Sequence, residues 1–71
     1  MQRRYRDALD AYAQAREHFA KLGEPGTVAA IWHQMGNAYR EAGQLEAAED
    51  AYRRSLVLEV QLEMSEVRRA R

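Results

Sequence analysis

The stretch Trp32–Gly43, WHQMGNAYREAG, places a glycine and an asparagine inside what otherwise reads as a helix. A glycine inside a helix lowers helix stability by about 1 kcal/mol relative to alanine. Gly36 is therefore expected to have a packing role, such as allowing close approach of a neighbouring element. The apolar residues on one side of this helix are Val28, Ile31, Trp32, Met35, Gly36, Tyr39 and Ala42. We predict a second helix with Thr27 as its N-cap and Gly43 at its end.

A first helix is predicted over residues 5–22. Its apolar residues recur at i, i+3, i+4 and i+7 and fall within an arc of about 140°. They are Tyr5, Ala8, Leu9, Tyr12, Ala15, Phe19 and Leu22. The segment Gly23–Gly26, GEPG, then supplies a glycine that suits a helix C-cap and a proline that does not continue a helix.

A third helix is predicted from about Leu45. No glycine or proline interrupts it through Arg71, so it can run longer than the first helix. Acidic residues lie near its start, where negative charge suits the helix dipole: Glu46, Glu49 and Asp50. The short connection at Gly43 implies an antiparallel helix pair. The predicted fold is therefore all-α, with three helices.

The first and third helices also repeat one another. A shift of 40 residues pairs Tyr5 with Leu45, Ala8 with Ala48, Tyr12 with Tyr52, Ala15 with Ser55 and Leu22 with Leu62. A period between 20 and 50 residues indicates stacked supersecondary units, each of which buries its apolar face against its neighbours.

Six residues of the second and third helices resemble the tetratricopeptide repeat, whose pattern is W-x-x-L-G-x-x-Y, then A-x-x-x-F, then P. They are Trp32, Met35, Gly36, Tyr39, Ala48 and Tyr52, with Met in place of Leu and Tyr in place of Phe. The resemblance implies antiparallel helix hairpins of an α-solenoid. Residues 5–22 would be the second helix of a preceding repeat, 27–62 one complete repeat, and 63–71 an extension or the start of another.

Two features depart from the pattern. Val60 stands where the pattern has proline, and the link between the first helix and Trp32 is about six residues longer than in the 34-residue form. The chain is similar to the longer variant of about 40 residues, and we expect it to be a fragment of a longer array. The resemblance places Gly36 and Ala48 where the helices cross. It also places Trp32 in the core, where truncation to alanine costs roughly 3 to 5 kcal/mol.

Composition excludes several function classes. The chain has 71 residues and no cysteine, so disulfides and cysteine-type zinc sites are absent, and a cytoplasmic location is expected. Its uncharged apolar runs, such as residues 55–58, are far shorter than the ~20 residues of a membrane span, so we expect no membrane partner.

Charge is balanced but unevenly distributed. Eleven basic residues equal eleven acidic ones, yet residues 7–66 hold only five of the basic residues. The remaining basic residues lie at the ends: Arg3, Arg4, Arg6, Arg68, Arg69 and Arg71. Contact of these arginines with phosphates is one alternative function. The acidic body and the absence of interleaved aromatic residues argue against it, so no nucleic acid partner is expected.

One side of the second helix is polar. We define this polar face as the arc of about 120° that points away from Trp32. Its residues are Ala30, His33, Gln34, Asn37, Arg40 and Glu41. The resemblance implies that this helix lines a concave groove for a protein or peptide partner. The side-chain amide of Asn37 offers a donor and an acceptor to a peptide unit, and the guanidinium group of Arg40 can bind a carboxylate through two parallel hydrogen bonds. A merely solvated helix face is the other open interpretation.

No catalytic or metal-binding set is recognisable. His33 and His18 have no second histidine or carboxylate at helical spacing that completes a site, so both are expected to be surface residues. No nucleotide-binding glycine motif occurs either. We expect no enzyme activity, no metal and no cofactor.

The third helix is apolar around much of its circumference. The residues expected to support self-association are Leu56, Val57, Leu58, Val60 and Leu62. Their counterparts in the first helix include Glu17 and His18, which are polar. Because a solvated helix would not be so apolar, we predict a homo-oligomer. A self-associating fragment without a groove ligand is therefore the main alternative function.

Overall fold

The computed structural model describes residues 2–70, with side chains over residues 4–66. Helix α1 spans Gln2–Lys21, α2 spans Pro25–Glu41 and α3 spans Leu45–Ala70. No strand occurs within residues 2–70, which confirms the predicted all-α class with three helices. At 26 residues, α3 is longer than the 20-residue α1, as predicted.

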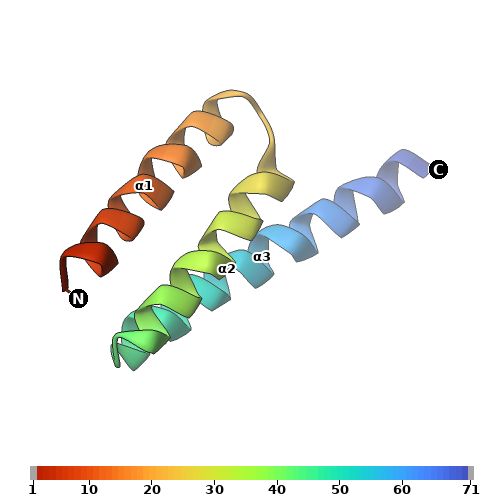
Figure 1. Ribbon diagram of the computed structural model, residues 1–71. Coiled ribbons are helices and arrows are strands. Elements are labelled where there is room, and N and C mark those ends of the chain that lie inside the picture. Colours follow the sequence, from red (N-terminus) through yellow and green to blue (C-terminus); the bar gives the residue numbers. More distant parts are fainter. Residues whose placement is uncertain (1, 71) are drawn as a thin grey trace.

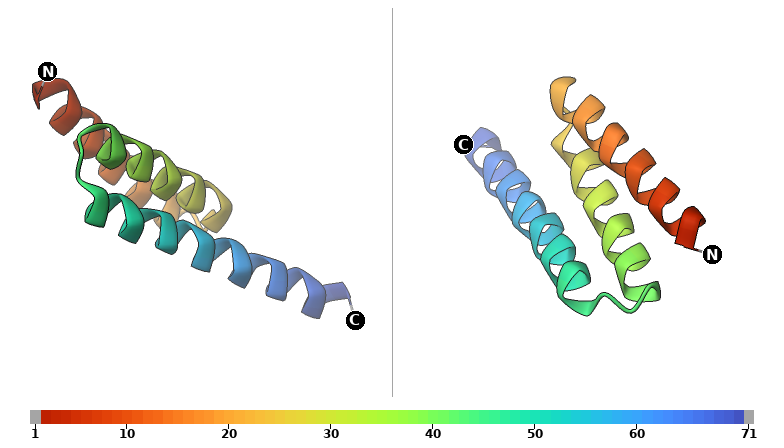
Figure 2. Two further views of the ribbon diagram at one scale, coloured as in Figure 1. Left: turned by 90° about the horizontal axis from the view of Figure 1, so that it is seen from below. Right: turned by 90° about the vertical axis from the view of Figure 1, so that its left-hand side faces the viewer.

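Helix α2 lies between the other two helices (Figure 1). It runs antiparallel to both and packs more extensively on α3 than on α1. Among the described residues, α1 and α3 make no close contact with each other. Figure 2 shows α2 in the middle of the row and the C-terminal part of α3 extending past the start of α2. The result is an elongated shape of 50 × 23 × 10 Å.

Both helix ends predicted at glycines are confirmed. Gly23 and Gly43 adopt φ values of +73° and +79°, a conformation in which a side chain is strained. The backbone amide of Glu24 donates to the carbonyl of Phe19 at 3.0 Å. The backbone amide of Gln44 donates to the carbonyl of Tyr39 at 2.9 Å. These six-to-one bonds satisfy carbonyls that each helix end would otherwise leave without partners.

The predicted start of α2 is wrong by three residues. Thr27 is not the N-cap, because α2 already begins at Pro25. Glu24 occupies the cap position and makes no side-chain capping bond. Proline suits the first position of a helix, since its φ is preset and its missing N–H would have no partner there. Pro25 therefore starts the second helix as well as preventing continuation of the first.

The core consists mainly of small side chains at the α2–α3 interface. Its buried residues are Val28, Ala29, Met35, Gly36, Ala48, Ala51 and Ser55. The apolar residues of α1 from Tyr5 to Phe19 are only half-buried, and Leu22 is 59% exposed. Helix α1 packs on one neighbour only, so its apolar side is covered incompletely.

Gly36 has the packing role that its helix position predicts. A Cβ atom at this position would lie 2.5 Å from a ring carbon of Tyr52, closer than real Cβ contacts allow. The approaching group is thus an aromatic ring of α3. Ala48, the other small residue of the crossing, is 3% exposed. The absent side chain of Gly36 creates the space in which Tyr52 lies.

Trp32 is half-buried and does not belong to the fully buried core. This corrects the expectation that it lies inside. The side of α2 that carries Trp32 lies between α1 and α3, which do not meet over it. The guanidinium carbons of Arg16 and Arg54 lie 4.2 and 5.0 Å from its ring centre. Two cations therefore lie beside the indole.

Candidate functional site

The polar face of α2 is largely open to solvent. Ala30, His33, Gln34, Arg40 and Glu41 are exposed. The sixth residue of the face, Asn37, is half-buried. Helical periodicity brings all six to one side of α2, because positions three or four apart lie one above another.

Asn37 differs from its neighbours because it is tied to α3. The hydroxyl of Tyr52 donates a hydrogen bond to the side-chain oxygen Oδ1 of Asn37, with an oxygen–oxygen distance of 2.5 Å. The amide nitrogen of Asn37 retains two N–H donors. As a consequence, part of the acceptor capacity of Asn37 is used within the protein, and its amide nitrogen keeps its two donors.

His33 joins the same cluster. Its ring centre lies 5.3 Å from that of Tyr52, with the two planes tilted by 52°. Tyr52 is half-buried and reaches this position because its ring crosses α2 at Gly36. We call His33, Asn37 and Tyr52 the tyrosine cluster. It joins the hairpin interface to the polar face.

Sequence reasoning did not include Tyr52 among the site residues. The available signal was the presence of tyrosine where the repeat pattern has phenylalanine. A tyrosine at a packed position brings a hydroxyl that needs a hydrogen-bond partner. The amide at Asn37, 15 residues earlier, is that partner.

Within the described residues, no three histidine, cysteine, aspartate or glutamate side chains are grouped as a metal site. His18 packs edge-on against its neighbour Phe19, with ring centres 5.4 Å apart. Glu46 lies in the first turn of α3, where its charge suits the helix dipole. The two other acidic residues near that start are ion-paired along the helix, Glu49 with Arg53 at 3.7 Å and Asp50 with Arg54 at 3.0 Å.

The outer side of α3 is apolar and exposed. We call it the α3 stripe and define it as Leu56, Val57, Val60 and Met64, which are 61%, 50%, 53% and 54% exposed. These positions fall within about 100° of the helix circumference. Met64 was not among the residues predicted for self-association.

Two residues predicted for self-association lie elsewhere. Leu58 and Leu62 are half-buried. Leu62 lies beside the first turn of α2, with its Cδ1 atom 3.9 Å from where a Cβ of Gly26 would be. Helix α2 therefore covers part of the apolar circumference of α3, and the exposed part is narrower than the sequence predicts.

Of the terminal arginines, Arg4 and Arg6 are exposed on α1. The side chains of the other four lie outside the described residues: Arg3, Arg68, Arg69 and Arg71. A phosphate-binding arrangement of all six therefore stays a sequence-based alternative. A separate result concerns membranes, because none of the helices in the described part of the chain has the length and apolar character of a membrane span.

Three helices of alternating direction, each packed beside its neighbour in the sequence, have the arrangement expected of a helical-repeat protein. A family model described as tetratricopeptide repeat matches residues 1–57, and the chain belongs to this family. No curated protein and no solved structure matches the chain. Proteins of the family generally mediate protein–protein interaction or scaffolding, and their repeats are typically not catalytic.

Proposed function

We propose that the chain is a protein-interaction module that binds a peptide or partner helix on the polar face of α2. In this proposal residues 27–62 form one complete repeat, and residues 5–22 contribute the second helix of the preceding one. The observation that carries the proposal is the hydrogen bond from Tyr52 to Asn37. It holds the amide in one orientation, so less side-chain entropy is lost when a ligand binds.

Each polar-face residue has a chemical role in this proposal. Asn37 donates from its amide nitrogen to a backbone carbonyl of the ligand. Arg40 is exposed one turn further along α2 and pairs with a ligand carboxylate, in two parallel hydrogen bonds where the geometry permits. His33, Gln34 and Glu41 contact the ligand at the edges, while the small side chain of Ala30 leaves room for it.

A peptide-display selection against the 71-residue chain tests this proposal. Selected peptides are expected to contain acidic residues and to lose at least about fivefold in affinity when Asn37→Ala or Arg40→Gln is introduced. Gln61→Ala, which truncates an exposed amide on α3, is the matched control and should leave the affinity unchanged. Peptides whose binding is insensitive to both polar-face variants would contradict the proposal.

A second candidate function is self-association through the α3 stripe. The exposure of its four apolar residues favours this function, because a solvated helix rarely presents such a continuous apolar surface. In a homo-oligomer a second copy covers Leu56, Val57 and Val60, together with Met64. Leu58 and Leu62 contribute at the border of that interface, since they are half-buried already. Isologous packing of two copies is the simplest arrangement.

A further inference from the structure

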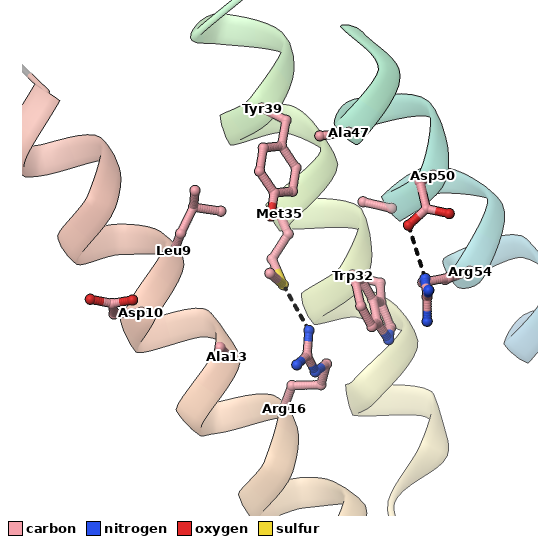
Figure 3. A pocket seen from close by; sticks show the side chains of 11 residues that line it. Leu9, Asp10, Ala13, Arg16, Trp32, Met35, Tyr39, Ala47, Asp50 and Arg54 are labelled. Atoms are coloured by element: carbon pink, nitrogen blue, oxygen red, sulfur yellow. Dashed lines mark hydrogen bonds and ion pairs between the residues drawn. The ribbon is translucent and has the colours of Figure 1, made fainter. Parts of the chain in front are cut away.

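A groove lies between α1 and α3 on the side of α2 opposite the polar face (Figure 3). Its volume is about 610 Å³. Trp32, Met35 and Tyr39 of α2 line its floor, and alanines at positions 13, 47 and 51 keep its walls low. Low walls allow the backbone of a bound segment to approach closely. The floor and the polar face lie about 180° apart on α2, so one ligand does not cover both.

Two guanidinium groups flank Trp32 at one end of the groove. Arg16 comes from α1 and Arg54 from α3 (Figure 3). Arg54 is paired with Asp50 at 3.0 Å. Arg16 donates only to the sulfur of Met35 at 3.6 Å and has no carboxylate partner within the described residues. Two cations beside one indole, one of them without a counter-charge, favour the binding of an anionic group between them.

The groove also has a charge polarity along its length. Asp10 precedes Arg16 on α1 by six residues, and Asp50 precedes Arg54 on α3 by four. Because α1 and α3 run in the same direction, both acidic residues lie toward Tyr39 and both arginines toward Trp32. At 1.5 Å rise per residue, the backbone positions of each aspartate and its arginine lie about 6 to 9 Å apart along the helix, while the charged groups of Asp50 and Arg54 pair at 3.0 Å.

We propose that this groove is a second binding site, for a peptide segment that carries a carboxylate and a basic side chain on either side of apolar residues. The carboxylate pairs with the guanidinium groups of Arg16 and Arg54 at the edge of the Trp32 ring, the apolar residues pack on Trp32, and the basic side chain lies toward the aspartates. In an extended peptide, which rises about 3.3 Å per residue, the two charges are then two or three residues apart. A polyanion fits poorly, because the aspartates repel it.

Trp32 is the single tryptophan of the chain, so its fluorescence reports on the groove directly. The probe is an end-blocked tetrapeptide in the order glutamate, leucine, leucine, lysine, titrated into the 71-residue chain up to millimolar concentration. We expect a saturable change in Trp32 emission. Replacing the peptide's glutamate or its lysine with glutamine should weaken binding at least about fivefold.

Adjacent arginines on α3 supply a matched pair of variants. Arg54→Gln should weaken binding at least about fivefold, whereas Arg53→Gln should not, since Arg53 is exposed and lies outside the groove. Arg16→Gln should act as Arg54→Gln does. Asp50→Asn removes the carboxylate that competes for Arg54, so it should tighten binding of the peptide that lacks lysine. Circular dichroism establishes that each variant is folded.

Three results would overturn the proposal. One is the absence of a saturable change with the glutamate–lysine peptide. Another is an equal loss of binding with Arg53→Gln and Arg54→Gln. The third is stronger binding of a thymidine oligonucleotide than of the peptide, which would assign the groove to nucleic acid. Asn37→Ala should leave the titration unchanged, so failure of the polar-face function is distinguishable from failure of this site.

Discussion

The hydroxyl of Tyr52 and the side-chain oxygen of Asn37 lie 2.5 Å apart, and this hydrogen bond joins α3 to the polar face of α2. Tyr52 reaches Asn37 because Gly36 provides the space for its ring. One glycine thus sets both the packing of the hairpin and the orientation of the amide. The packing of the hairpin and the proposed binding surface therefore share Tyr52.

Tyr52→Phe removes the hydroxyl and keeps the ring on Gly36. We expect the free energy of unfolding to fall by about 0.5 to 1.5 kcal/mol, the usual net value of one hydrogen bond, as measured by urea denaturation. Tyr12→Phe is the matched control, since Tyr12 occupies the corresponding position of α1 and its hydroxyl has no protein partner among the described residues. Equal losses in the two variants would show that the bond to Asn37 adds nothing.

Gly36→Ala tests the close packing on Tyr52. Alanine gains about 1 kcal/mol of helix propensity, but its Cβ would lie within 3.0 Å of three ring carbons of Tyr52. Overpacking typically costs about 1 to 3 kcal/mol, so we expect net destabilisation in thermal unfolding. In a Tyr52→Ala background the clash is gone, and the same substitution should stabilise the chain.

Gly26→Ala is the control for this prediction. Gly26 lies in the first turn of α2, and a Cβ atom added there would have Leu62 Cδ1 as its nearest neighbour, at an ordinary contact distance of 3.9 Å. This substitution should be neutral or stabilising. If Gly36→Ala also proves stabilising in the original chain, the ring does not occupy the position described.

Trp32→Ala is expected to be less damaging than its place in the repeat pattern suggests. Trp32 is half-buried, so its truncation should cost less than the roughly 3 to 5 kcal/mol of a buried aromatic residue. Met35 is 5% exposed, and Met35→Ala should cost about 2 to 5 kcal/mol. We therefore expect Met35→Ala to lower the urea midpoint at least as far as Trp32→Ala. The opposite order would place Trp32 in the core.

Val60→Glu should weaken self-association. Val60 is 53% exposed near the centre of the α3 stripe, so a carboxylate there would be buried without a partner in an oligomer but solvated in a monomer. Sedimentation equilibrium at micromolar concentration should show a lower mass for this variant than for the original chain. Gln61→Glu adds the same charge at an exposed position outside the stripe and should not change the mass. A monomeric original chain would rule out the stripe as an interface.

The sequence by itself determined the number of helices, their approximate extents and the glycines that end them. These features depend on local interactions: apolar spacing along one chain segment, and the positive φ at Gly23 and Gly43. The first helix begins at Gln2, three residues before its predicted start. The wrong start of α2, at Thr27, arose because proline has two local roles, and only the conformation of residues 24–26 distinguishes them. The sequence also identified the tetratricopeptide repeat family, because the pattern of this family consists of particular residues at fixed spacings.

Only the tertiary structure decided which surfaces these helices cover. Trp32 was predicted inside because its spacing matches core positions, but α1 and α3 pass on either side of it and leave it at the floor of a groove. The pairing of Asn37 with Tyr52 and the convergence of Arg16 and Arg54 join residues 15 and 38 positions apart in the chain. Spacing along one helix specifies a direction from its axis. What lies in that direction depends on how the neighbouring helices cross, and this follows from side-chain packing between them.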